Sequence, residues 1–113
     1  MNESLLLRGT ELRYVLTMQL FRHGPATVGE LAEALAQHGF AVGGRTSKSI
    51  SDALRWEMGH GRVRRLRRGR YGPGWMPRGT EHRIHTRELA LRDQAKCRSE
   101  PGTLPPATTG PLA

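Results

Sequence analysis

The sequence has little cysteine, few aromatic residues and no long apolar run. Cys97 is the only cysteine among 113 residues, so no disulfide can form within the chain, which fits a reducing compartment. Aromatic residues make up 5%, too few for a protein that binds single strands by stacking bases on aromatic rings. No apolar run approaches the roughly 18 residues that a membrane-spanning helix requires. The three leucines at 5–7 are too few for the core of a signal peptide. We therefore expect a cytoplasmic protein that does not bind membranes.

Acidic residues are scarcest where basic residues gather. The chain carries 18 Lys and Arg against 10 Asp and Glu, for a formal net charge of +8. Residues 45–70 contain nine basic and two acidic residues, so this window holds +7 (9 − 2) and the rest of the chain +1 (8 − 7). A GC-rich genome would explain why Arg outnumbers Lys, but not the clustering. A concentrated positive field is typical of a polyanion partner.

The spacing of apolar residues predicts a first helix that packs on two sides. One face carries Leu12, Val15, Leu16 and Leu20 at helical spacing, and the pattern stops at residues 23–25, His-Gly-Pro. A second stripe lies on roughly the opposite side and consists of Tyr14, Met18 and Phe21. Because an exposed apolar patch of this size is unusual on a monomer, we expect a last helix or a second subunit to cover it.

Two further helices follow. Thr27 and Glu30 form a capping-box pattern at the start of one, and Gly39 is placed to end it. The next helix is predicted to be capped by Thr46 or Ser47 and to end at residues 59–61, Gly-His-Gly. Glu57 falls on its inward face, where a leucine is expected. Either the rim of the core is wet there or Glu57 pairs with an arginine, and we favour the wet rim. We expect Trp56 to be half-buried against the hairpin or the second helix.

Residues 62–71 predict a β-hairpin with a charged loop at 67–70. Gly69 provides the positive φ that short hairpin loops need. Val63 and Leu66 break strict alternation, which indicates a bulge between them. The sequence thus predicts a mainly α protein with a small hairpin, of the α+β class.

A last helix is predicted over residues 80–96. Ile84, Leu91 and Ala95 form a thin apolar stripe with Glu88 inside it, and Trp75 is expected to anchor this helix to the domain. Residues 98–113 contain four prolines with Gly and Thr, so we expect a disordered tail. The expected organisation is a domain at 1–79, a helix at 80–97 that packs on the domain or on a second subunit, and a tail at 98–113.

The order of these elements resembles the winged helix-turn-helix domain over roughly residues 10–74. The resemblance rests on three segments, TVGELAEALAQHG (27–39), RTSKSISDALRWEMGHG (45–61) and RVRRLRRGRYGPG (62–74). The run from Ala53 to Tyr71 is similar to small winged-helix regulators of actinobacteria. Glu57 departs from the usual apolar residue of the family.

The resemblance implies that the third helix enters the major groove of double-stranded DNA and that the wing lies on the backbone or in a minor groove. The residues carried over for the third helix and its entry are Arg45, Ser47, Lys48, Ser51, Asp52 and Arg55. Those carried over for the wing are Arg64, Arg65, Arg67, Arg68 and Arg70. The residue types themselves agree: arginine pairs with guanine edges, serine bonds a base or a phosphate, and aspartate accepts from cytosine.

Other chemistry has weaker support. His82 and His85 have a metal-compatible spacing, but only Glu81 and Glu88 lie near them, so we expect a surface pair and no metal site. No phosphate-binding glycine loop and no paired carboxylates or Ser-His arrangement stand out. We therefore expect no enzyme activity and no cofactor.

Three functions stay open at this point. The first is a sequence-specific double-stranded DNA-binding protein, a transcriptional regulator associated with the nucleoid. The second is an architectural DNA binder with weak sequence preference. The third is a winged helix used for protein interaction, against which the +7 window argues. Ser51, Asp52 and Arg55 favour the first. A homodimer through Tyr14, Met18, Phe21 and the last helix is also possible.

Overall fold

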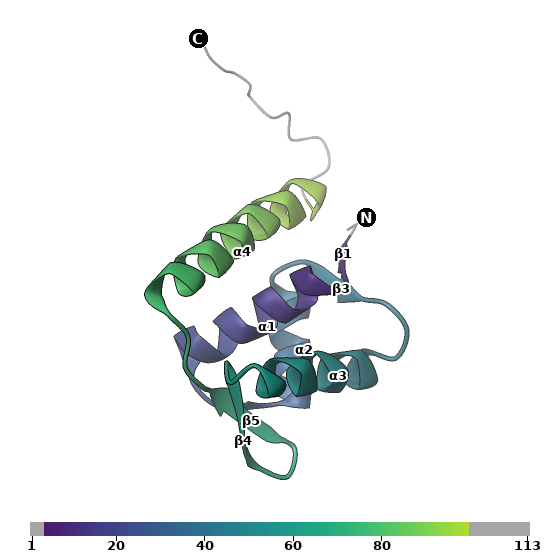
Figure 1. The fold of residues 1–113 in the computed structure, drawn as a ribbon. Helices are drawn as coiled ribbons and strands as arrows, with labels where there is room; N and C mark the ends of the chain where they lie inside the picture. Colours follow the sequence, from purple (N-terminus) through teal and green to yellow (C-terminus); the bar gives the residue numbers. More distant parts are fainter. Residues whose placement is uncertain (1–3, 100–113) are drawn as a thin grey trace.

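Helix α1 (Thr10–His23) lies between α3 and α4 in the computed structural model, which describes residues 4–99 (Figure 1). Its residues Leu12, Val15, Leu16 and Leu20 enter the main core. On its other side, Met18 is buried against Met76 and Ile84, with Tyr14 and Phe21 packed around them. The prediction that this helix packs on two sides is confirmed. The fold over residues 4–99 is α+β, with four helices and two small sheets.

Helix α2 (Val28–Gln37) begins at the predicted capping box. The Glu30 amide donates to Oγ1 of Thr27 at 3.1 Å, and the Thr27 amide donates to Oε1 of Glu30 at 2.9 Å. Two otherwise unpaired amides are satisfied in this way, which fixes the first turn. Gly39, just after the helix, has a φ of +81° and turns the chain out of it.

Two strands of three residues were not predicted. Strand β1 (Leu5–Leu7) pairs in parallel with β3 (Phe40–Val42), with Leu5 opposite Phe40 and Leu7 opposite Val42. Leu7 is fully buried and Phe40 is 3% exposed. Leu7 therefore belongs to the core with Leu5 packed against it, while Leu6 is exposed, and strand β1 pairs with the connector between α2 and α3.

Helix α3 (Thr46–Gly59) starts earlier than the predicted caps allow, by one residue for a Thr46 cap and by two for a Ser47 cap. Arg45 occupies the N-cap position, and no side chain caps the helix, so the prediction of a Thr46 or Ser47 cap is wrong. The hydroxyl of Ser49 instead donates to the Gly43 carbonyl at 3.0 Å and ties the first turn to the preceding loop. The inward residues Ile50, Ala53 and Leu54 are buried in the main core.

The predicted hairpin is present as β4 (Val63–Arg67) and β5 (Arg70–Pro73). A third strand, β2 (Ala26–Thr27), pairs with β5, so the sheet order is β2-β5-β4 and all pairs are antiparallel. The register shifts between Arg65 and Arg67, which is the expected bulge.

Helix α4 (Arg78–Ser99) is longer at both ends than the predicted helix. Ile84, Leu91 and Ala95 are buried as expected, and α4 packs on the second stripe of α1, where Met18 is buried and Tyr14 and Phe21 are partly buried. Trp75 is 72% exposed, so its predicted anchoring role is wrong, and Met76 occupies the contact instead. The expected tail begins inside α4 at residues 98 and 99, and its remainder lies outside the described residues.

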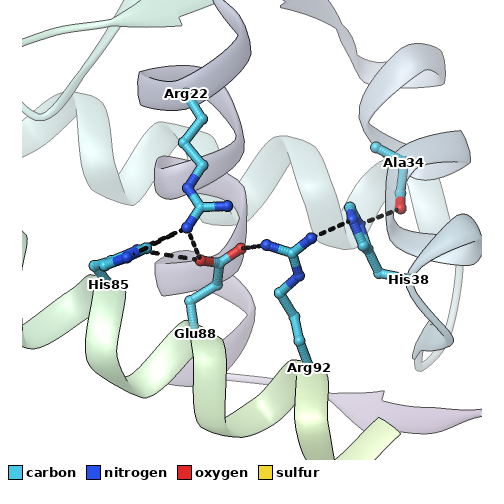
Figure 2. A network of polar contacts seen from close by, with 6 residues as sticks. All are labelled: Arg22, Ala34, His38, His85, Glu88 and Arg92. Atoms are coloured by element: carbon cyan, nitrogen blue, oxygen red, sulfur yellow. Dashed lines mark hydrogen bonds and ion pairs between the residues drawn. The ribbon is translucent and has the colours of Figure 1, made fainter. Parts of the chain in front are cut away.

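A polar network joins α4 to α1 and α2 beside this apolar contact (Figure 2). Glu88 is 3% exposed, and its Oε2 accepts from Nη1 of Arg92 at 3.4 Å. Its Oε1 lies 3.7 Å from Nη2 of Arg22 on α1. Arg92 also contacts His38 at the end of α2.

Within residues 4–99, no helix combines the length and the apolar character needed to cross a bilayer.

Candidate nucleic-acid interface

The outward face of α3 carries the residues that the sequence analysis predicted as DNA contacts of this helix. Ser47, Lys48, Asp52 and Arg55 are exposed and Ser51 is partly exposed, while Ile50, Ala53 and Leu54 point into the core. This division follows from the helical period, because the apolar residues recur on the side that packs against α1 and α2. The face therefore presents hydroxyl, ammonium, carboxylate and guanidinium groups to the solvent.

The charges on this face pair with one another. Nζ of Lys48 lies 3.0 Å from Oδ2 of Asp52, and Nη1 of Arg55 lies 3.5 Å from Oδ1 of the same carboxylate. The side chains of the three residues are 68%, 50% and 77% exposed in the order Lys48, Asp52, Arg55. Such exposed pairs contribute about 0–1 kcal/mol, so a ligand can compete for either cation. Asp52 thus pairs with two basic side chains on α3, and both remain able to exchange this partner for a phosphate or a base.

The entry to α3 adds one unpaired cation. Arg45 is exposed, and its side chain has no ion-pair or hydrogen-bond partner among residues 4–99. It stands after Gly44, whose φ of +65° gives the turn that leads into the helix. The first turn of α3 contains no acidic residue. A phosphate group near Arg45 would therefore meet a side-chain cation and the positive end of the helix.

The hairpin carries three more basic side chains without a partner among residues 4–99. Gly69 has a φ of +73° at the tip, as predicted. Arg65, Arg67 and Arg68 are exposed, and their side chains have no hydrogen-bond or ion-pair partner in the part of the chain that the structure describes. The remaining two arginines of the predicted wing set have contacts. Nε of Arg64 donates to the Pro73 carbonyl at 3.2 Å, and Nη1 of Arg70 lies 4.0 Å from Oε1 of Glu30.

Glu57 contradicts the prediction of a wet rim. It is fully buried, and its Oε1 accepts from Nε of Arg62 at 2.6 Å, with a second bond from Nη2 of Arg62 to Oε2 at 3.1 Å. The alternative, pairing with an arginine, is therefore correct. The hydrogen bond to Glu57 raises the pKa of Arg62 above its ordinary value, against the smaller opposing effect of burial. Arg62 is thus committed to the protein interior and is not one of the outward cations.

Trp56 is about half exposed, as expected, but the contacts that the structure gives it are not the predicted ones. It is 51% exposed, it stacks on His60 with ring centroids 5.0 Å apart, and the guanidinium carbon of Arg13 lies 4.7 Å from its ring centroid. The sequence prediction placed it against the hairpin or α2. Arg13 lies on α1 and Trp56 lies on α3, 43 residues further along the chain. No local pattern in the sequence indicated this contact.

A pocket of about 460 Å³ opens beside the outward face of α3. Its rim includes Asp52 and Trp56 from α3, Arg8 before α1 and Arg13 within α1. The pocket brings two more basic side chains next to the predicted contact face. His82 and His85 lie in a separate pocket beside α1, and no group of three or more metal-binding side chains occurs among residues 4–99.

α3 and the hairpin lie at the same end of the molecule, and α4 lies at the other (Figure 1). The structure therefore brings the two predicted contact sets to one side, with Glu57 and Arg62 between them. Comparison of the chain with family models, curated proteins and solved structures gave no match, so the functional argument rests on this geometry.

Proposed function

We propose that this protein is a sequence-specific double-stranded DNA-binding protein of the winged helix-turn-helix type that regulates transcription. The observation that carries the proposal is the position of Arg65, Arg67 and Arg68. They lie unpaired within residues 4–99 on a hairpin at the same end of the molecule as the polar face of α3. The element order supports the same reading, because α1, β2, α2, α3 and the hairpin follow one another and β2 joins the hairpin sheet.

In this proposal the two elements have different tasks. α3 enters the major groove, where Arg55 pairs with guanine, Ser51 bonds a base or a phosphate, and Asp52 accepts from cytosine. The hairpin arginines bind phosphates or enter a narrow minor groove, where the negative potential is enhanced. Arg45 binds a phosphate at the start of α3. An acid on the contact face has no use in purely electrostatic binding, so Asp52 favours sequence selection.

An architectural DNA binder with weak sequence preference is the second candidate. One observation favours it: the side chains of Arg65, Arg67 and Arg68 on the hairpin have no partner among residues 4–99, whereas Lys48 and Arg55 on α3 are engaged by Asp52. Contacts to phosphate give affinity without sequence information. Binding by this second mode would spread over all duplexes with only a bias for flexible or narrow-grooved DNA.

Selection of bound duplexes from a random pool separates the candidates. A sharp motif supports the regulator, a weak AT or shape bias supports the architectural protein, and no enrichment contradicts both. A salt titration completes the test. If six phosphates are neutralised, a plot of log K against log salt has a slope of about −5. A slope shallower than about −2 would contradict nucleic-acid binding altogether.

A further inference from the structure

The carboxylate of Glu57 lies where α1, α3 and the base of the hairpin meet. Its Oε1 accepts from the hydroxyl of Thr17 on α1 at 3.2 Å, in addition to the bond from Nε of Arg62. Its Oε2 lies 3.4 Å from Nε of Arg13, also on α1, and accepts from Nη2 of Arg62. Thr17 and Glu57 are fully buried, and the side chains of Arg13 and Arg62 are 22% and 21% exposed.

Arg62 connects this carboxylate to both strands of the hairpin. It immediately precedes β4, and its amide donates to the Glu57 carbonyl at 3.1 Å. Its own carbonyl accepts from the amide of Gly74, just after β5, at 2.8 Å. The residue that binds Glu57 through its side chain thus holds the first strand of the hairpin directly and the second strand through the backbone.

Apolar packing alone does not fix the hairpin on α3. Val63 is the only residue of β4 that is buried, and the other four are exposed. On the other strand, Tyr71 packs against the core in part, and β2 pairs with two residues of β5. These contacts hold β5, whereas on the β4 side the bidentate arginine–carboxylate pair is the directional contact. Buried ion pairs carry a large desolvation cost and often add little net stability, so orientation is the property that such a pair provides best.

We propose that Glu57 is a positioning residue for DNA binding, a role that rests on the proposed function. Its carboxylate sets the angle at which the hairpin projects from α3. The hairpin arginines and the outward face of α3 then reach one duplex together. Glu57 touches no DNA itself and acts through Arg62.

The orientation is tested first without DNA. Residual dipolar couplings of backbone amides report the direction of the hairpin relative to α3 in the free protein. In the wild type, the couplings of the hairpin and those of α3 are expected to fit one common alignment frame. In Glu57→Gln, where an amide replaces one carboxylate oxygen opposite the guanidiniums, the hairpin couplings shrink and no longer fit a common frame with α3. A hairpin that keeps its direction in this variant overturns the proposal.

Glu88→Gln is the matched control. Among residues 4–99, Glu88 is the other buried glutamate with basic neighbours, but it joins α4 to α1 directly and to α2 through Arg92, and it has no hydrogen bond or ion pair to the hairpin there. Both variants raise the net charge by one, which by itself tightens DNA binding. Glu57→Gln is instead expected to weaken binding to the selected site about tenfold and to make the salt slope shallower. Glu88→Gln is expected to keep affinity at or above that of the wild type.

Arg62→Lys keeps the proposal testable if Glu57→Gln does not fold. Lysine retains the charge beside Glu57 but cannot form the bidentate pair, so the same loss of orientation and affinity is expected. Equal affinities for the wild type, Glu57→Gln and Glu88→Gln would show that Glu57 is structural only. If the wild type itself binds no duplex, the proposed function fails and the DNA-positioning role falls with it. The coupling measurements still decide whether Glu57 orients the hairpin.

Discussion

Nη2 of Arg92 donates a hydrogen bond to Nε2 of His38 at 2.8 Å and so joins α4 to the end of α2 (Figure 2). Arginine has only donors, so Nε2 must be the acceptor and the ring proton lies on Nδ1. From there it is donated to the Ala34 carbonyl at 3.0 Å. Burial, and second to it the charge of Arg92, lower the pKa of His38 below its ordinary value of 6.5. The folded protein therefore holds this histidine neutral.

The neutral His38 predicts lower stability in acid. Between the lowered folded pKa and the ordinary unfolded value of 6.5, the unfolded chain binds more protons than the folded one. Stability from this group is therefore present above pH 6.5 and is lost as the pH falls through that window. The charges around the ring are Arg92, Glu88 and His23. Melting temperatures of the wild type and His38→Gln are to be compared at neutral and acidic pH. The wild type should lose more, and parallel curves would contradict the assignment.

Local signals in the sequence were enough for several elements. The capping box at Thr27 and Glu30 and the positive φ of Gly69 depend on neighbouring residues only, and the structure contains both. The second stripe of α1 also predicted a covering element correctly, because burial of Met18 follows from helical spacing. The assignment of contact residues on α3 and the hairpin remains a prediction.

Contacts between distant residues were not predictable in the same way. Glu57 was assigned to a wet rim because no nearby pattern shows that Arg13 and Thr17 approach it from α1. Strands β1 and β3 have three residues each, too few for an alternation to be recognised. The sequence predicts that Trp75 anchors the last helix to the domain, but the chain places Met76 in that contact.

Two glycines near the end of β5 are expected to differ in how much stability a substitution by alanine costs. A Cβ on Gly74 would lie 2.2 Å from the Gly61 carbonyl oxygen, a backbone atom at the base of the hairpin. A Cβ on Gly72 would lie 3.1 Å from Cδ1 of Leu66, the end of a flexible and exposed side chain. Gly74→Ala should therefore lower the free energy of unfolding by about 1–3 kcal/mol or more. Gly72→Ala should cost clearly less in the same denaturant titration. Equal losses would contradict this backbone geometry.

The shape of the hairpin tip is tested at Gly69. Its φ of +73° suits glycine and is tolerated by asparagine, but a β-branched residue resists it. Gly69→Val leaves every arginine in place and the net charge unchanged, yet it should weaken DNA binding because the tip is misaimed. Gly69→Asn is the control and should bind nearly as the wild type does. Normal binding by Gly69→Val would mean that the arginines act as a flexible charged segment.

The hairpin arginines should supply affinity without choice of sequence. The side chains of Arg67 and Arg68 are exposed and have no hydrogen-bond or ion-pair partner among residues 4–99, so their truncation breaks no polar contact there. Arg67→Ala and Arg68→Ala should each weaken selected and random duplexes by similar factors. Each should also make the salt slope shallower by about one. A variant that loses only the selected site would show that the hairpin reads bases.

Arg55 should supply sequence choice instead. Its side chain is 77% exposed and its contact is the 3.5 Å pair with Asp52, so Arg55→Ala leaves the helix intact and shifts stability by no more than about 0.5 kcal/mol. On the selected site it should cost about 1–3 kcal/mol, because a bidentate contact to a guanine edge is lost, and much less on random duplexes. Lys48→Ala is the control, because it removes the other cation paired with Asp52. It shows how much of any effect comes from the loss of a partner of Asp52 alone. Binding curves on both duplexes for both variants give the comparison. If Arg55→Ala weakens every sequence equally, α3 does not read bases, and architectural binding becomes the better account.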